Sequence, residues 1–436
     1  MTAILLDHLL RGTLPDPDST DMLSVPAKSV ALVPSLQGAA SNLVGSIGFG
    51  PRLLVVSDPT TRAVLGERIV TELRDRFVVD EFVLGEQPYA DLETVAAIEA
   101  HQDAAGAMGL IAVGAGTIND LCKYAAHRRG IPYAVFATAP SMNGYTSVSA
   151  AITVDGHKRS LPATAAIGVF ADLGILAKAP PRMVQSGFGD SICRSTAQAD
   201  WLLAHLLLDQ PYRHAPFTLL QADEAILLAR PAELLQGDVG MMELLMRNLI
   251  LSGFGMTICG GSYPASQGEH LISHYLEMLP PPGWSPAFHG EQVAVATLTM
   301  ARLQEKMLQG PVPVLRASTL READLVAHFG SELGRSCWPG FATKRLDAGQ
   351  ARHLSERLAR DWSGICTAIN SIRRPAADLH RALIAVGAPT LPGDIGLSAE
   401  DYHHAVLQAR EIRDRFTFLD LAAESGRLAD FVATYA

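Results

Sequence analysis

The chain has 436 residues, which is too long for one ordinary domain and predicts two or three. Its composition, 48% hydrophobic and 18% charged, is typical of a compact globular protein and not of a disordered one. The formal net charge is −10, and the sequence contains no basic block, which argues against nucleic acid as a partner.

The cysteines and the N-terminus predict a reduced, cytoplasmic setting. Five cysteines lie far apart without a CxxC pair, which favours free thiols over disulfides or a cysteine zinc site. The N-terminal MTAILLDHLLRGTLPDPDST has no basic region ahead of its apolar residues, so we expect no signal peptide. Apolar runs such as WLLAHLLL are too short to span a bilayer. We therefore expect a cytoplasmic protein without a membrane span.

Apolar runs typical of buried strands alternate with helical patterns in the first part of the chain. The expected strands are Ser29–Pro34, Leu53–Ser57 and the runs VVDEFVLG, GLIAVG, IPYAVFATAP and AAIGVFAD, the last of which ends at Asp172. Helical patterns such as TRAVLGERIVTELRDRF and TINDLCKYAAHRRG lie between them. This alternation predicts a parallel, doubly wound sheet. The run AITVDGHKRSL, Ala151–Leu161, interrupts it and predicts a hairpin with Asp155 and Gly156 as its turn.

From ILAKAPPRMVQSGFGD onward, helical patterns follow one another with Gly and Pro breaks and hardly any strand pattern. The sequence therefore predicts an α/β N-terminal domain with a Rossmann-like sheet, residues 1–180. An all-α C-terminal domain, residues 181–436, is expected to follow, with the boundary near Pro180 and Pro181.

The clearest single motif is IAVGAGTINDLCK, in which an apolar strand enters a turn with Gly114 and Gly116 and leaves through a helix. These glycines let the backbone approach a ligand, and free N–H groups at a helix start suit a phosphate. Asn119 occupies the position of the third glycine of GxGxxG, so the dinucleotide fingerprint is incomplete. An ordinary tight strand-to-helix turn is the alternative.

Two further loops follow expected strands. Asp58 ends the first strong strand, where its carboxylate suits a ribose and favours NAD over NADP; the alternative is a cap for the next helix. Ala137–Ser147, ATAPSMNGYTS, is rich in hydroxyls and glycine. Because ligands bind outside the carboxyl ends of strands in open α/β sheets, we expect these loops and the glycine turn to converge.

A candidate metal motif lies in SQGEHLISHYLEM, where His270 and His274 are four residues apart on a predicted helix. They share one face, which fits a two-histidine metal site and also fits two histidines with unrelated partners. Glu269 is misplaced for the HExxH pattern. Asp190 in SGFGD and His289 in FHGEQ are further candidates, and each alone has an ordinary helix or loop interpretation.

Five separated motifs together resemble the glycerol-1-phosphate dehydrogenase family, within the iron-containing alcohol dehydrogenase and dehydroquinate synthase group. They are GAGTINDLCKYAAHRRGIPYAVFATAPSMNGYTS, DGHKRSLPA, AKAPPRMVQSGFGD, GEHLISH and HGEQVAV, in the family's order. The resemblance spans about Val56 to Ala296. It implies a dehydroquinate synthase-like architecture with a nucleotide domain followed by a helical domain, which the order of expected elements predicts independently.

The resemblance also implies roles for individual residues. A catalytic divalent metal would be held by Asp190, His270 and His289, and the substrate would contact Asn143, Asp190 and His274. Residues 1–180 would then form the dinucleotide-binding domain and residues 181–436 the metal- and substrate-binding domain. The expected contacts of NAD or NADP are Asp58, Gly114, Gly116, Thr117, Ile118, Asn119, Asp120, Thr138, Ala139, Pro140, Ser141 and Ser147.

The chain departs from the family pattern at two positions. The usual triple-glycine turn contains Ala115 here, which narrows the space for a pyrophosphate. The family's SMDG loop has Asn143 in place of an aspartate that contacts substrate. The second change affects the substrate assignment and leaves the cofactor and metal assignments unchanged.

The expected protein is a metal-dependent, NAD(P)-linked dehydrogenase of a polyol phosphate, in phospholipid metabolism. The resemblance implies glycerol 1-phosphate and dihydroxyacetone phosphate as substrates, with a metal acting as Lewis acid. Two imidazoles and a carboxylate suit zinc, with iron or nickel as options. The alternatives are a dehydroquinate synthase-like lyase that uses NAD transiently and a non-catalytic dinucleotide-binding relative. We also expect a homo-oligomer.

Overall fold

The computed structural model describes residues 2–154 and 157–435, and its chain divides into two compact units. The first unit comprises Met1–Ser191 and His214–Ser262, and the second comprises Ile192–Arg213 and Tyr263–Ala436. Each unit is described by itself.

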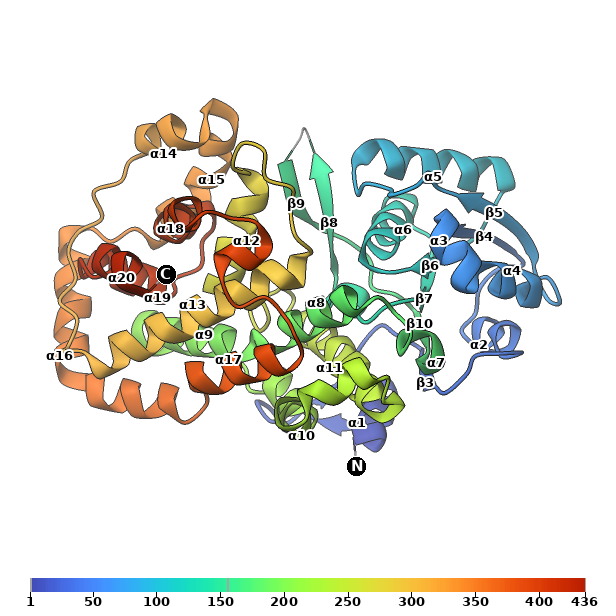
Figure 1. Cartoon of the computed structure of the whole chain (residues 1–436), viewed down its shortest axis with the longest axis horizontal. Helices are drawn as coiled ribbons and strands as arrows, with labels where there is room; N and C mark the ends of the chain where they lie inside the picture. The colour runs from blue at the N-terminus through green and yellow to red at the C-terminus, as the bar shows by residue number, and fades with distance from the viewer. Residues whose placement is uncertain (1, 155–156, 436) are drawn as a thin grey trace. The chain divides into compact units, whose positions relative to one another are not determined.

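A six-stranded parallel sheet forms the centre of the first unit, with strand order β3-β10-β7-β6-β4-β5 (Figure 1). The central strands β6, β7 and β10 are buried at every position, as continuous apolar runs in a parallel sheet should be. The strands are β3 (Ser29–Val33), β4 (Arg52–Ser57), β5 (Val78–Val83), β6 (Leu110–Gly114), β7 (Tyr133–Ala137) and β10 (Gly168–Asp172). The predicted doubly wound sheet is confirmed.

Helices cover both faces of this sheet. One face packs against α2 (Ala40–Ser46) and α4 (Glu67–Leu73), which share an apolar cluster with alternate residues of β4 and β6. The other face packs against α5 (Leu92–Ala105) and α6 (Gly116–Arg129). The strand order reverses between β4 and β6, because β5 lies on one side of β4 and β6 on the other. The loops after these two strands therefore flank the switch point where α/β folds bind ligands.

The remaining strands of the first unit lie outside the main sheet. The predicted hairpin is formed by β8 (Ser149–Val154) and β9 (His157–Pro162), which pair antiparallel. Its predicted turn, Asp155 and Gly156, lies outside the described residues. Near the N-terminus, α1 (Thr2–Leu10) leads into a short ribbon of β1 (Leu14–Pro15) and β2 (Met22–Leu23), which the sequence did not predict.

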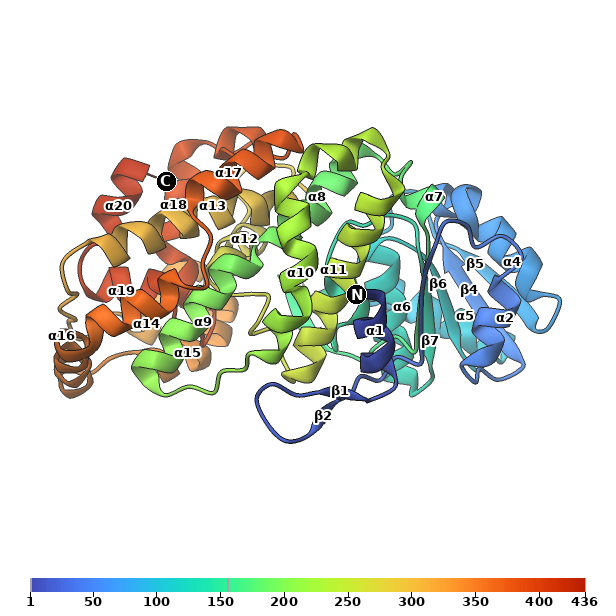
Figure 2. The same cartoon turned by 90° about the horizontal axis from the view of Figure 1, so that it is seen from below.

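The first unit also contains α-helices beyond residue 180, namely α8 (Pro181–Ile192) almost entirely, α10 (Ala215–Ala229) and α11 (Val239–Ile258). Figure 2 shows α10 beside α11, and α11 in turn packs against β3 and the small helix α7 (Leu173–Leu176). Secondary structure changes near Pro180, where the sequence placed its boundary. The packing units divide elsewhere, because α11 contacts β3 and α7 of the first unit and α10 packs against α11.

The second unit is helical throughout its described residues, which confirms the predicted all-α character of this part of the chain. The helix α13 (His289–Gln309) is almost entirely buried among its neighbours in the unit, α9, α12, α17, α19 and α20 (Figure 1). The helices are α9 (Arg194–Leu208), α12 (Gly268–Met278), α13, α14 (Glu322–Phe329), α15 (Ser331–Lys344), α16 (Ala348–Asn370), α17 (Ala376–Ala385), α18 (Ala399–Gln408), α19 (Phe418–Glu424) and α20 (Leu428–Tyr435). Among the described residues, none of the helices combines the length and apolar character needed to cross a membrane.

Candidate cofactor and metal sites

The predicted glycine turn joins β6 to α6 at the carboxyl edge of the sheet. A Cβ on Gly114 would lie 2.6 Å from the side chain of Ile118, so this glycine allows α6 to begin close to its strand. The first residue of α6 is Gly116, and no side chain of the described residues caps the helix, whose N-cap residue is Ala115. The first backbone N–H groups of α6 therefore have no capping side chain and can donate to a phosphate.

The four predicted contacts after Gly116 separate into two groups. Thr117 is exposed at the start of α6, whereas Ile118 and Asn119 are buried. Asn119 donates from Nδ2 to Asp120 Oδ1 at 3.0 Å, and Asp120 Oδ2 accepts the Ala151 N–H at 3.1 Å. Asn119 and Asp120 thus connect α6 to β8. Among the predicted cofactor contacts at the start of α6, Gly116 and Thr117 are therefore the ones most accessible to a ligand.

The loop Ala137–Ser147 is held from inside by Lys123, a residue that the sequence argument did not single out. The Lys123 side chain is fully buried, and its ammonium donates to Gly144 O, to Ser147 Oγ at 3.1 Å and to Ser149 O at 3.0 Å. Burial lowers the pKa of Lys123, and Asp120 opposes that shift. The Ser147 hydroxyl, a predicted cofactor contact, is therefore engaged inside the loop.

Two helices approach the same loop closely through glycines. A Cβ on Gly187 of α8 would lie 1.6 Å from Pro140 O, and a Cβ on Gly253 of α11 would lie 2.2 Å from Thr146 Oγ1. Next to the first of these contacts, Ser186 Oγ donates to Ser141 O at 3.1 Å. The predicted contacts Thr138, Ala139, Pro140 and Ser141 therefore lie in a tightly packed segment, of which Ser141 is the most accessible.

Asn143 and Asp190 are brought together in the first unit. The Asn143 backbone N–H donates to Asp190 Oδ2 at 2.7 Å, and both residues are buried. Asn143 is 8% exposed, and its Nδ2 is buried without a hydrogen-bond partner among the described residues. A buried amide group that lacks a partner is costly, which makes it a candidate donor for a bound ligand.

Asp58 caps the helix that follows β4. Its Oδ1 accepts the Thr61 N–H at 2.7 Å, and Thr61 Oγ1 accepts the Asp58 N–H at 3.0 Å, which completes a capping box. The structure thus contains the cap that the sequence offered as an alternative to ribose binding. One carboxylate oxygen makes this bond, so the cap does not by itself occupy the second oxygen.

In the second unit, three histidines converge. His270 and His274 lie on one face of α12, and His289 is the first residue of α13. The ring centroids are 5.8 Å apart for His270 and His274, 5.1 Å for His270 and His289, and 5.9 Å for His274 and His289. His270 is buried, and the other two are half-buried. The predicted grouping of His270 with His289 is therefore present, with His274 beside them.

A carboxylate that the sequence argument missed belongs to this group. Glu277 lies three residues after His274, and His274, Glu277 and His289 each offer a ligand atom within 4.8 Å of the others. The Glu277 Oε1 to His289 Nδ1 distance is 3.9 Å. The sequence does contain a signal for Glu277: His270, His274 and Glu277 fall at i, i+4 and i+7 of one helix, which places them on one face. This second set around His289 competes with the predicted one for a metal.

Asp200 on α9 is a fully buried carboxylate near the start of α12. It accepts the Gly268 N–H and the Phe418 N–H, each at 3.0 Å. Burial, followed by the charge of Glu269, raises the pKa of Asp200 from 3.8 to about 8. The folded protein therefore keeps a proton on Asp200 at a pH where the unfolded chain releases it.

This shift predicts a pH dependence of stability. As pH rises from about 4 to about 8, Asp200 should lower the free energy of unfolding, by at most about 1.4 kcal/mol per pH unit. Asp200→Asn removes the titration, so its free energy of unfolding should fall less steeply over this range. Urea unfolding of both proteins at several pH values measures the two slopes, and equal slopes would contradict the assignment.

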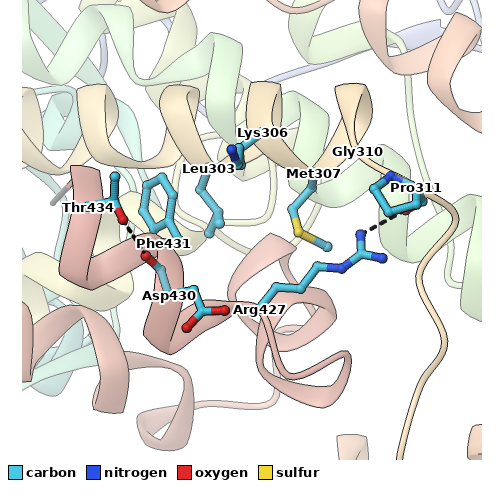
Figure 3. A pocket seen from close by; sticks show the side chains of 9 residues that line it. All are labelled: Leu303, Lys306, Met307, Gly310, Pro311, Arg427, Asp430, Phe431 and Thr434. Atoms are coloured by element: carbon cyan, nitrogen blue, oxygen red, sulfur yellow. Dashed lines mark hydrogen bonds between the residues drawn. The ribbon is translucent and has the colours of Figure 1, made fainter.

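A hollow of about 320 Å³ elsewhere in the second unit contains none of the predicted site residues (Figure 3). It lies between α13 and α20, over Leu303, Met307 and Phe431. Its Arg427 guanidinium donates to the backbone carbonyls of Pro311 and Val312 at 2.8 and 3.2 Å. We therefore assign no ligand to this hollow.

Comparison with known proteins agrees with this arrangement. The family model of iron-containing alcohol dehydrogenases matches residues 32–180. Glycerol dehydrogenase structures from Sinorhizobium meliloti (a probable one) and Schizosaccharomyces pombe have TM-scores of 0.60 and 0.61 at 16% and 15% identity. They cover 94% and 93% of this chain and 98% and 90% of their own, and they show the fold alone. The sheet and the helical unit thus have the fold of these structures, and residues 32–180 match the family of iron-containing alcohol dehydrogenases.

Curated relatives give a narrower assignment. A glycerol-1-phosphate dehydrogenase (NAD(P)+) from Halalkalibacterium halodurans is 30% identical over 378 residues, 84% of each chain. A protein of the same name from Pyrococcus furiosus is 36% identical over 265 residues, 60% of this chain and 74% of its own. The chain belongs to the glycerol-1-phosphate dehydrogenase family.

Proposed function

We propose that the protein is a metal-dependent, NAD(P)-linked dehydrogenase that interconverts glycerol 1-phosphate and dihydroxyacetone phosphate. The observation that carries the proposal is the group His270, His274 and His289 in a chain whose named relatives are glycerol-1-phosphate dehydrogenases. When bound, the nicotinamide would accept a hydride from the substrate carbon, and the substrate hydroxyl would release a proton. The reverse reaction consumes NAD(P)H and a proton.

In this proposal three residues would hold one divalent ion. His270 and His289, whose ring centroids are 5.1 Å apart, would supply two imidazoles. Asp190, one oxygen of which accepts the Asn143 N–H, would supply the carboxylate. Two histidines and a carboxylate with an open position form a common catalytic zinc site, and iron or nickel would also accept this set. When bound, such an ion polarises a substrate oxygen. We propose that His274, on the same face of α12, contacts the substrate.

The first unit fits a dinucleotide. The uncapped start of α6, with Gly116 and Thr117, offers backbone N–H groups to a pyrophosphate at the switch point of the sheet. The second carboxylate oxygen of Asp58 offers an acceptor to a ribose hydroxyl, which would favour NAD over NADP. In this proposal residues 1–180 bind the dinucleotide, and residues 181–436 supply most of the metal and substrate contacts.

An assay of NAD and NADP reduction tests the proposal. The substrates are glycerol 1-phosphate, glycerol 3-phosphate, glycerol and simple alcohols, each with the zinc-loaded and the chelator-treated protein. We expect turnover on glycerol 1-phosphate that is lost on metal removal. Turnover of the dehydroquinate synthase substrate without net NADH would favour the lyase. Binding of metal and dinucleotide without any turnover would favour a non-catalytic relative.

Asn143→Asp is the variant on which the substrate assignment depends. The Asn143 amide offers a buried donor where the family pattern has a carboxylate acceptor. A charged acceptor binds a substrate hydroxyl roughly twice as strongly as a neutral one, so we expect kcat/KM on glycerol 1-phosphate to rise about tenfold. Slower turnover by the variant would assign Asn143 to a site already adapted to its own substrate.

We also propose a cytoplasmic homo-oligomer. The five cysteines are free thiols, which is consistent with a reducing compartment. Light scattering of the purified chain measures the oligomeric state, and a monomer at micromolar concentration would contradict this part of the proposal.

A further inference from the structure

The residue directly before His270 is a glutamate that no solvent reaches. Glu269 is 0% exposed, and its Oε1 lies 3.0 Å from His270 Nδ1. The same oxygen accepts the Gln267 N–H at 2.9 Å, and Oε2 accepts the Thr196 hydroxyl at 3.2 Å. The carboxylate is therefore fixed from two sides, by the start of its own helix and by α9.

The acceptor at Nδ1 determines which form of the imidazole is present. Glu269 Oε1 already accepts the backbone N–H of Gln267, so in its 3.0 Å contact with His270 Nδ1 the ring is the donor. The ring therefore keeps its proton on Nδ1, and the lone pair lies on Nε2.

We propose that Glu269 is a positioning residue, which orients His270 and makes Nε2 a better metal ligand. The inference rests on the proposed function, in which His270 binds the metal. Carboxylates that accept from a ligating histidine fix its tautomer and raise its basicity, and their loss costs about 10- to 100-fold in metal affinity. This role could not be predicted from the sequence, because a glutamate on a helix is ordinarily exposed to solvent.

A purely structural role is the competing explanation, since Glu269 also binds the Gln267 N–H at the start of α12. Glu269→Gln keeps the size and one acceptor oxygen but removes the charge. Asp200→Asn is the matched control, because Asp200 is equally buried and accepts the Gly268 N–H but does not contact His270. A structural role would lower the stability of the metal-free protein in both variants and leave metal affinity unchanged.

The experiment measures zinc affinity by competition with a chromogenic chelator, and thermal unfolding with and without zinc, on the full chain. We expect the zinc Kd of Glu269→Gln to rise 10- to 100-fold, with a smaller zinc-induced increase in Tm, while Asp200→Asn keeps the Kd of the unmodified protein. An unchanged Kd in Glu269→Gln would overturn the inference alone. Absence of zinc binding by the unmodified protein would overturn the proposed function and this inference with it.

A measurement on the unmodified protein covers the case in which Glu269→Gln does not fold. Nitrogen NMR of the metal-free chain, with the His270 signals assigned through His270→Asn, reports which ring nitrogen carries the proton. We expect the proton on Nδ1. A proton on Nε2 would overturn the inference, because Nε2 could then not be the ligand that Glu269 prepares.

Discussion

His270→Ala and His289→Ala are each expected to abolish metal retention and turnover while the chain stays folded. The two rings have centroids 5.1 Å apart, and in the proposed site each supplies one of three protein ligands. Losing one of three protein ligands leaves an incomplete coordination shell, which lowers the metal affinity of such a site. Elemental analysis after dialysis measures retained metal, NAD reduction measures turnover, and thermal unfolding of the metal-free proteins reports the fold.

His274→Ala is the control on the same face of α12. It should keep the metal and raise KM or lower kcat, because His274 is assigned to the substrate. The opposite result would also have a structural explanation, because His274, Glu277 and His289 form a second possible set of metal ligands. Loss of metal in His274→Ala with retention in His270→Ala would move the ion to that set. Asp190→Ala would be harder to interpret, because it would remove a proposed metal ligand and also the acceptor of the Asn143 N–H.

The sheet of the first unit could be predicted because its signals are local. Each central strand is a continuous apolar run, since a parallel sheet is covered on both faces, and each helix between them has its own pattern. The packing of α11 against β3, and of α10 against α11, could not be predicted. The sequence of a helix shows that one face is apolar, but it does not show which element packs against that face.

In the candidate site, too, local sequence patterns could be predicted and tertiary contacts could not. The spacing of His270 and His274 predicts a shared face, and the resemblance assigns Asp190 and His289, already candidates, as ligands beside His270. The role proposed for Glu269 depends on its burial, which the sequence does not show. Glu277 was missed although its spacing places it near His274 on α12, because its nearness to His289 depends on the packing of α13. The motif-based range also includes Asn119 and Asp120, and in the structure Asn119 donates to Asp120, which accepts the Ala151 N–H of β8. A motif identifies a segment, and only tertiary packing distinguishes the residues that face a ligand from those that hold the segment in place.

Lys123 is the residue that holds the proposed cofactor and substrate loop in place, and Lys123→Met tests this role. The ammonium satisfies Gly144 O, Ser147 Oγ and Ser149 O inside the first unit, with Asp120 Oδ1 at 3.5 Å. Methionine fills a similar volume but donates no hydrogen bond, so these acceptors lose the ammonium, although the Ser147 hydroxyl still reaches Gly144 O and Ser149 O and can donate to one of them. Each acceptor left unsatisfied costs about 1–3 kcal/mol, part of which is offset because no charge is then buried, so we expect a net loss of roughly 1–3 kcal/mol.

Cofactor binding should also weaken in Lys123→Met, independently of the loss of stability, because the loop that Lys123 holds contains Asn143 and Ser147. We expect the Kd for NAD to rise at least about tenfold, which corresponds to about 1.4 kcal/mol, at temperatures where the variant is still folded. Lys178→Met is the matched control, since it removes the same charge from an exposed side chain of the same unit. Urea unfolding and NAD titration of the three proteins separate the two effects. A variant at Lys123 that is as stable as the control and binds NAD equally well would show that the loop holds its conformation without the buried ammonium.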